Sequence, residues 1–298
     1  MKTIARWVAG LLALVLVVIG GLVVKGSLGL RRVRDIPFKP IAVVSDSSTI
    51  AHGKHLAQVI MKCSDCHGGD LGGRNPFADA RPLGVVNGPN LTTGEGGSIS
   101  RYDDPALARA IRHGIKVDGR PILLMPAGSY LRTSEADVAA VIAYVRSVPP
   151  IDRTIPPSQV HPVGRLLYAL GQFPIVEADR VDHAAAPSPN QAPAPTVEYG
   201  QYLADIGGCT GCHGPGLSGG KIPGTPPEWK PASNITPLGL KGWTEADFVT
   251  ALKTGIRPNK TPIDTIMPWR FAGQMDSTEM RAVWLFLQSV PEKAFGGR

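Results

Sequence analysis

Two cysteine-containing motifs constrain the fold of this chain more than any other feature. The sequence reads Cys-Ser-Asp-Cys-His at residues 63–67 and Cys-Thr-Gly-Cys-His at residues 209–213, which together use all 4 cysteines. Cys-x-x-Cys-His is the motif that attaches a c-type haem, because two thiols bond to the porphyrin and the following His ligates the iron. The sequence therefore predicts two covalently bound haem c groups. Their attachment and proximal residues are Cys63, Cys66, Cys209, Cys212, His67 and His213.

Two other kinds of site share the Cys-x-x-Cys spacing: zinc sites and thioredoxin-like redox pairs. A zinc site would need the two cysteine pairs to converge, or a second pair of ligands near each, and neither neighbourhood offers a close pair. A thioredoxin-like motif follows a strand, whereas Leu56, Val59, Ile60 and Cys63 recur at helical spacing. The two copies, each with its His in the same place, therefore favour haem.

The sequence around the two motifs repeats, so one module is used twice. The matching segments are residues 52–57 with 199–204, 90–92 with 234–236, 110–115 with 251–256, and 147–149 with 289–291. Each module is predicted to contain an opening helix that ends in the motif, a middle helix at 105–113 or 245–254, and a closing helix. The closing helices carry apolar residues at i, i+3, i+4 and i+7 from Val138 and from Met280.

We therefore expect an all-α fold with two haem domains in tandem, at residues 41–150 and 196–298. Between them, residues 184–195 consist almost wholly of Ala, Pro, Ser, Asn and Gln, which is typical of a linker. We take residues 151–195 as this Pro/Ala-rich linker. An apolar stretch inside it, residues 163–173, is expected to pack in the groove between the domains or to touch a partner.

The N-terminal segment is predicted to enter a membrane. Residues 7–24 carry no charge between Arg6 and Lys25, and a helix of that length reaches about 27 Å, close to the hydrocarbon thickness of a bilayer. We interpret residues 1–30 as a retained anchor, with a cleaved signal peptide as the alternative. More basic residues follow this segment than precede it, which alone would keep the body in the cytoplasm. Covalent haem attachment takes place outside the bacterial cytoplasmic membrane, so we expect the haem domains on the periplasmic side.

The net charge of +7 is not a sign of nucleic-acid binding. Residues 1–40 hold 7 basic and 1 acidic residue, a net +6, while the remaining segments are each within one charge of neutral. The excess therefore lies beside the hydrophobic segment, where it suits anionic lipid headgroups. We find no phosphate-binding loop, nucleophile–base pair or nucleic-acid motif in the sequence.

The sixth iron ligand decides what each haem can do, since a Met thioether favours electron transfer and an open position permits small-molecule chemistry. Met125 and Met267 occupy equivalent positions of the repeat, and each is followed by Pro. We assign them as the distal ligands. Their alternative is an ordinary core role. The other candidate ligands are Met275 in the second module and His52, His55 or His113 in the first.

Two further pairs of residues repeat between the modules. Asn90 and Asn234 are expected either to orient loop backbone or a haem propionate by hydrogen bonding, or simply to form turns. Gly53 and Gly200 are predicted to allow a close crossing of the opening helix over the closing helix.

On these motifs, the chain resembles class I cytochrome c domains in tandem. Residues 234–237, 242–248, 251–256, 266–268 and 289–291 are similar to the cytochrome c subunits of membrane-bound bacterial alcohol, aldehyde and gluconate dehydrogenases, from about residue 41 to the C-terminus. The resemblance implies a partner catalytic subunit that oxidises substrate, and electron flow toward ubiquinone or a terminal oxidase. Those subunits usually carry three haem motifs, whereas this chain carries two.

Three functions remain open on the sequence. The first is a membrane-anchored dihaem cytochrome without substrate chemistry of its own, which takes electrons from a periplasmic dehydrogenase and delivers them to another cytochrome, a quinone or a terminal oxidase. The second is a dihaem subunit of a respiratory oxidase complex. The third is a dihaem enzyme such as a peroxidase or a thiosulfate dehydrogenase, which would need a vacant or labile site at one iron.

Overall fold

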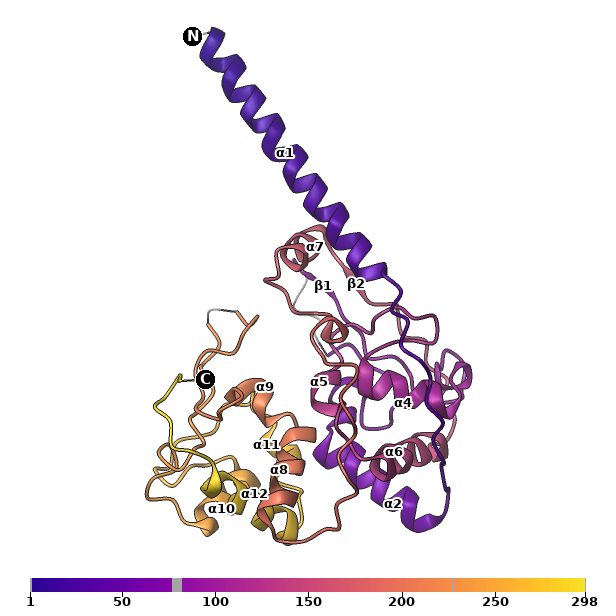
Figure 1. Cartoon of the computed structure of the whole chain (residues 1–298), viewed down its shortest axis with the longest axis vertical. Helices are drawn as coiled ribbons and strands as arrows, with labels where there is room; N and C mark the ends of the chain where they lie inside the picture. The colour runs from indigo at the N-terminus through magenta and orange to yellow at the C-terminus, as the bar shows by residue number, and fades with distance from the viewer. Residues whose placement is uncertain (1, 77–81, 227, 298) are drawn as a thin grey trace.

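A long N-terminal helix projects from a body of two helical modules (Figure 1). The computed structural model describes residues 2–76, 82–226 and 228–297. Helix α1 (Lys2–Arg31) contains the uncharged segment, and its mean hydropathy reaches 2.8 over an 18-residue window. It is the one helix of the described residues that is long and apolar enough to cross a membrane. Most of its apolar side chains are exposed, as Trp7 is at 77%.

The α-helices of the two modules correspond to one another and follow in the same order. The first module consists of α2 (Ser47–His55), the π-helical turn η1 (Leu56–Ile60), α3 (Cys63–His67), the 3-10 turn η2 (Ile99–Arg101), α4 (Asp104–His113), α5 (Ala127–Tyr130) and α6 (Glu135–Ser147). The second consists of α8 (Val197–Ile206), α9 (Cys209–His213), α10 (Glu245–Thr254), α11 (Trp269–Ala272) and α12 (Ser277–Ser289). The predicted repeat, with its middle and closing helices, is therefore confirmed.

The sequence predicts an N-cap at the start of each closing helix, from Ser134 with Asp137 and from Asp276 with Glu279, and both caps are formed. The Ser134 side chain accepts a hydrogen bond from Asp137 N, and the Asp276 side chain accepts one from Glu279 N. Only the second start is a full capping box, in which the Glu279 carboxylate also accepts from the backbone of its cap. The Asp137 carboxylate instead forms hydrogen bonds with His52 and Tyr202.

Glycine lets the opening and closing helices of each module cross closely, as the sequence predicts. A β-carbon on Gly53 would stand 1.8 Å from the carbonyl oxygen of Ala140, and one on Gly200 would stand 1.9 Å from that of Ala282. Only glycine tolerates this approach of two backbones. The crossing fixes α2 on α6 and α8 on α12, and so positions the motif that follows each opening helix.

The segment between the modules is more structured than its composition suggests. Strand β2 (Gln159–Val160) pairs antiparallel with β1 (Gly84–Val85) of the first module, and it is followed by α7 (Pro162–Ala169) and the turn η3 (Glu177–Asp179). A second small core joins this segment to the first module through Val86, Ile115, Val160, Ile175, Val176 and Ala178. The apolar stretch at residues 163–173 was expected in the groove between the domains or against a partner. It begins with α7, which instead packs against α1 (Figure 1).

The two modules share one hydrophobic core. It runs from Leu56 and Val138 in the first module to Leu203 and Trp284 in the second. Polar contacts cross the same junction: His55 Nε2 lies 2.8 Å from a carboxylate oxygen of Glu279. The modules therefore form one packed body.

Candidate haem sites

Each Cys-x-x-Cys-His motif occupies a short helix of its own. The residue before the motif is left-handed in both modules, Lys62 at φ 55° and Gly208 at φ 71°. The opening helix therefore stops before the motif, where the sequence predicted that it would continue into it. The left-handed residue changes the direction of the chain, so α3 and α9 do not continue the helices that precede them. A non-glycine residue in this conformation costs about 1–2 kcal/mol, so Lys62 is held there by its contacts.

The histidines of the two motifs have matching hydrogen bonds. His67 Nδ1 donates to the carbonyl oxygen of Pro89 at 3.0 Å, and His213 Nδ1 donates to that of Ser233 at 2.7 Å. Because a carbonyl oxygen only accepts, each Nδ1 carries the proton and the lone pair lies on Nε2. This arrangement orients metal-ligating histidines in general. Burial also lowers the pKa of His67 and so favours the neutral, ligating imidazole.

The surroundings of the cysteines disfavour a zinc site. Burial raises the pKa of Cys63 to about 12, and it raises the pKa values of Cys66 and Cys209 as well. Zinc binds thiolates, which such surroundings disfavour. Among the described residues, which include all four cysteines, there is no disulfide and no group of three His, Cys, Asp or Glu side chains that could hold a metal ion. The first cysteine of each motif lies against the shared core.

Met125 and Met267 stand in matching loops. Each side chain is partly buried against the shared core, as Cys63 and Cys209 are. Each methionine also begins a turn of the same form, in which its carbonyl oxygen accepts from the backbone N–H two residues on, at 2.8 Å in both modules. The prolines that follow have nearly equal backbone angles and cap α5 and α11. The structure thus brings both thioethers to the same core as the first cysteine of each motif.

The histidines considered as alternative ligands have other partners. His52 Nε2 lies 2.7 Å from the Asp137 carboxylate, and His55 contacts Glu279. His113 Nδ1 lies 3.0 Å from His183 Nδ1, and burial, followed by the neighbouring His183, lowers the pKa of His113 to about 4. These contacts favour the methionines as distal ligands.

The family model for cytochrome c matches residues 50–149 and again residues 197–291. The chain belongs to the cytochrome c family. The predicted fold class, an all-α pair of cytochrome c domains behind an N-terminal apolar helix, is confirmed, with the two-stranded sheet as a small addition.

Three relatives show what this cytochrome is similar to. It is 27% identical to the fructose dehydrogenase cytochrome subunit of Gluconobacter japonicus, over 89% of this chain and 57% of that protein. It is 28% identical to the cytochrome c subunit of the quinone alcohol dehydrogenase of Gluconobacter oxydans, over 71% of this chain and 48% of that protein. The chain therefore spans about half the length of these two relatives. It is 26% identical to a diheme cytochrome c-type of Cereibacter sphaeroides, over 90% of this chain and 95% of that protein.

The two asparagines orient loop backbone. Asn90 is fully buried, donates to the carbonyl oxygens of Ile151 and Arg153, and accepts from Thr92. Asn234 makes the equivalent contacts with Lys293 and Thr236. Each amide ties the loop after the proximal histidine to the segment after the closing helix. Each asparagine therefore orients loop backbone and also forms a turn, because its side-chain oxygen accepts from the backbone N–H two residues on.

Lys62 is the residue at this site that sequence reasoning missed. Its ammonium group donates to the carbonyl oxygens of Ile60 and Gly207, so it bridges the residues that precede the two motifs. Burial lowers the pKa of Lys62, whereas the thiols of Cys209 and Cys63 act to raise it. Because Lys precedes one motif and Gly precedes the other, a comparison of the two repeats does not single out this position. Only the docking of the modules places this charge beside both motifs.

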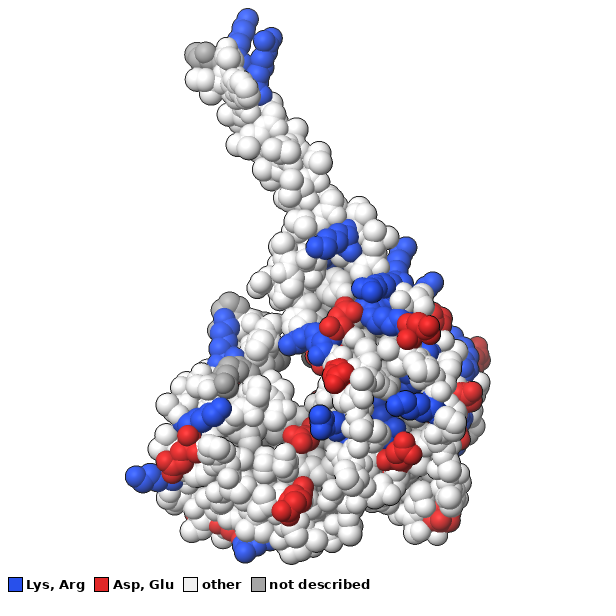
Figure 2. Space-filling model, viewed as in Figure 1, with Lys and Arg blue, Asp and Glu red and all other residues white. Residues whose placement is uncertain are grey.

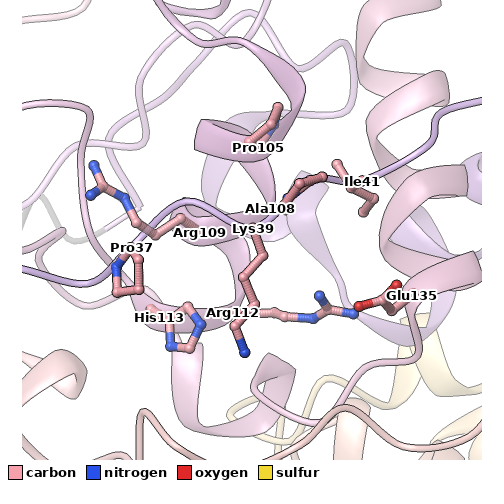
Figure 3. Close-up of a pocket in the computed structure, with 10 residues that line it drawn as sticks. Pro37, Lys39, Ile41, Pro105, Ala108, Arg109, Arg112, His113 and Glu135 are labelled. Atoms are coloured by element: carbon pink, nitrogen blue, oxygen red, sulfur yellow. The ribbon is translucent and has the colours of Figure 1, made fainter.

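A small hollow on the first module lies apart from the motifs. Figure 3 shows it between residues 37–41 and α4, with the side chains of Arg109 and Arg112 at its wall. Arg109 donates to Ile36 O and to two further carbonyl oxygens, and Arg112 donates to Thr133 O. The Arg109 guanidinium holds the chain after α1 on the first module, whereas that of Arg112 ties α4 to the loop before α6. The hollow is therefore part of the packing of the body.

Proposed function

We propose that this protein is a membrane-anchored dihaem c-type cytochrome that carries electrons from a periplasmic dehydrogenase to a respiratory acceptor. The observation that carries the proposal is the doubled site. Both modules hold a Cys-x-x-Cys-His turn whose histidine is oriented by a backbone carbonyl, and both modules belong to one packed body. We assign haem attachment to Cys63, Cys66, Cys209 and Cys212, and iron ligation to His67, Met125, His213 and Met267.

The proposed role of the protein is to hold and shield a redox group. Haem c, when bound, supplies a one-electron iron couple. In each module the imidazole tautomer is set by Pro89 or Ser233, and the thioether is held in a loop against the core. Two protein ligands per iron leave no open position for a substrate. This supports an electron-transfer role over a dihaem peroxidase or thiosulfate dehydrogenase.

The closeness of the two motifs supports electron exchange within one chain. Lys62 directly precedes the first motif, and it hydrogen-bonds to Gly207, two residues before Cys209. Tyr130 donates to the carbonyl oxygen of Met61 at the same junction. In the same region, Figure 2 shows an opening through the body near α5 and α9. The arrangement therefore suits two haems that are near neighbours.

The donor and the membrane side are part of the proposal. Several relatives are cytochrome subunits of fructose, alcohol and gluconate dehydrogenases, which supports a dehydrogenase catalytic subunit as the electron donor. Helix α1 supports anchoring in the bacterial cytoplasmic membrane, and covalent haem supports a periplasmic body. We propose another cytochrome, a quinone or a terminal oxidase as the acceptor.

Purification from solubilised membranes tests this function. The full-length protein, tagged at its C-terminus, is extracted with mild detergent, and the proteins that copurify in stoichiometric amount are determined by mass spectrometry. We expect a dehydrogenase catalytic subunit. We also expect haem reduction in the preparation when its substrate is supplied from a panel of ethanol, D-fructose and D-gluconate. Stoichiometric recovery of the core subunits of a haem–copper oxidase, with no dehydrogenase subunit and no haem reduction by any of these substrates, would contradict the proposal.

A further inference from the structure

Helix α7 is in close contact with α1. A β-carbon on Gly26 would stand 2.1 Å from the carbonyl oxygen of Arg165, and one on Gly29 would stand 2.8 Å from the ring of Tyr168. The Arg165 guanidinium also donates to Ser27 Oγ at 3.3 Å. Figure 1 shows α7 beside the end of α1 that enters the body. The two helices therefore meet backbone to backbone at a fixed level of α1.

This level is the end of the apolar segment. The uncharged residues end at Val24, and Gly26 lies two residues further, which is about 3 Å along a helix axis. The headgroup layer of a bilayer is about 5–7 Å thick on each side of the hydrocarbon. If α1 spans the membrane, the contact with Arg165 therefore lies within the headgroup layer.

Both helices expose large apolar side chains at this level. Val24 and Leu28 of α1 are 58% and 66% exposed, and Val163 of α7 and Leu170 at its C-terminus are each 50% exposed. The opposite side of α7 is used by the body: Gly164 is buried against the carbonyl oxygen of Leu83, and Tyr168 and Phe173 pack on the second core. One side of α7 thus rests on protein and the other presents apolar surface beside the membrane segment.

The charges around this contact suit an anionic surface. Lys25, Arg31 and Arg32 are exposed at the same end of α1, and Figure 2 shows Lys and Arg side chains gathered where the helix meets the body. Arg34 is paired with Asp179, which also accepts from Tyr168. Clusters of basic residues next to a membrane helix bind anionic phospholipid headgroups. Exposed apolar residues with nearby basic ones are the composition of helices that lie in a membrane surface.

We propose that α7 is an interfacial helix whose partner is the phospholipid bilayer, with Val163 and Leu170 inserted at the boundary between headgroups and acyl chains. The inference rests on the proposed anchoring by α1. It adds that the body is fixed by two helices, so that its orientation to the membrane is set. The faces of the two haem modules remote from α7 are then the ones available to soluble partners.

Photocrosslinking of the full-length holoprotein tests this inference. The photoreactive residue p-benzoylphenylalanine replaces Val163 or Leu170, and the protein is irradiated in vesicles of phosphatidylethanolamine and phosphatidylglycerol. Mass spectrometry then measures phospholipid adducts. Val44 and Ile256, which are 59% and 40% exposed elsewhere on the body, serve as matched control positions. Trp7, inside the apolar segment, serves as the positive control.

We expect phospholipid adducts at Val163 and Leu170 at least 10-fold above those at the two control positions. Adducts at the control level, with strong labelling at Trp7, would overturn this inference and leave the anchor intact. Loss of labelling at Trp7 would instead contradict the proposed anchoring. In native membranes, crosslinking of Leu170 to a protein in place of lipid would also overturn the inference.

A substitution at the helix contact gives an independent test. Gly26→Leu places a side chain where the Arg165 carbonyl lies, whereas Gly21→Leu meets nothing within 4 Å. We expect Gly26→Leu to reduce the lipid adduct at Leu170 several-fold while labelling at Trp7 persists, and Gly21→Leu to change neither. Equal adducts in the two variants would show that α1 does not position α7.

Discussion

At the scale of single residues, the charge of Lys62 is the most unexpected feature of the haem sites. Its ammonium group is part-buried at the module junction, where Lys62 directly precedes Cys63 and hydrogen-bonds to Gly207, two residues before Cys209. A positive charge near an iron stabilises the reduced state, because reduction removes one unit of positive charge. Lys62 should therefore raise the potentials of both haems.

Replacing Lys62 with Met removes this charge. A unit charge at a part-buried site is worth about 1–2 kcal/mol, and about 1.4 kcal/mol corresponds to about 59 mV for one electron. We therefore expect both potentials to fall by an amount on the order of 50 mV in a spectroelectrochemical titration. Lys54→Met, on the exposed surface of α2, is the control. A shift of the same size in both variants would argue against the role of Lys62.

The distal ligands are tested at the same scale. In Met267→Ala and Met125→Ala, we expect the haem to stay covalently attached while its potential falls and exogenous ligands gain access to the iron. The far-red absorption band of Met-ligated ferric haem should drop by half in each variant. Met275→Ala removes a neighbouring methionine that also packs against the core, and it should leave the band unchanged. Loss of the band in Met275→Ala would assign the ligand there instead.

At the scale of elements, the crossing of the opening and closing helices sets the position of each motif. Gly200→Ala forces a β-carbon to within 1.9 Å of the Ala282 carbonyl, so the helices must separate. We expect a loss of about 1–3 kcal/mol in the free energy of unfolding, measured by urea denaturation of the holoprotein. Gly69→Ala, where a β-carbon meets nothing within 4 Å, is the control. A smaller loss at Gly200 than at Gly69 would contradict the argument.

The elements that could be predicted from the sequence are those with local signals. The Cys-x-x-Cys-His turns, the apolar periodicity from Val138 and Met280, and the caps at Ser134 and Asp276 each depend on residues within a few positions of one another. The Met-Pro sequences at Met125 and Met267 could be identified because the two copies of the repeat can be aligned with each other. Such patterns were enough for the fold class and the candidate ligands.

The remaining features depend on contacts between distant parts of the chain. The break at Lys62 is stabilised by a bond to Gly207 in the other module, and α7 is placed by its contact with Gly26. Asp137 was predicted in a capping arrangement, but its carboxylate bonds to His52 and Tyr202. None of these pairings leaves a periodic pattern in the sequence, because each partner is set by how the modules dock.

At the scale of the whole molecule, a buried polar contact makes the docking of the modules sensitive to pH. The hydrogen bond with Glu279 raises the pKa of His55 above its ordinary value of 6.5, and burial opposes this shift. Asp276 of the same capping turn also favours the charged imidazole. Since the folded-state pKa is raised, the stabilisation is fully present below pH 6.5 and is lost as the pH rises through the folded-state pKa.

The corresponding prediction concerns urea unfolding of the holoprotein at pH 6 and at pH 8.5. The wild-type protein should lose stability between these two values, and His55→Gln should show a smaller loss because it lacks the titrating group. Glu279→Gln, which removes the carboxylate while keeping a polar side chain, should match His55→Gln. An unchanged pH dependence in both variants would show that this pair does not stabilise the junction.

The central claim is that one packed body holds two covalently attached haems. The most direct measurement is the intact mass of the purified protein after acid–acetone extraction, which removes haem that is not covalently bound. We expect the mass of the polypeptide plus two haems, reduced to one haem in Cys209→Ala/Cys212→Ala. A mass with one haem or none in the wild-type protein would contradict the account.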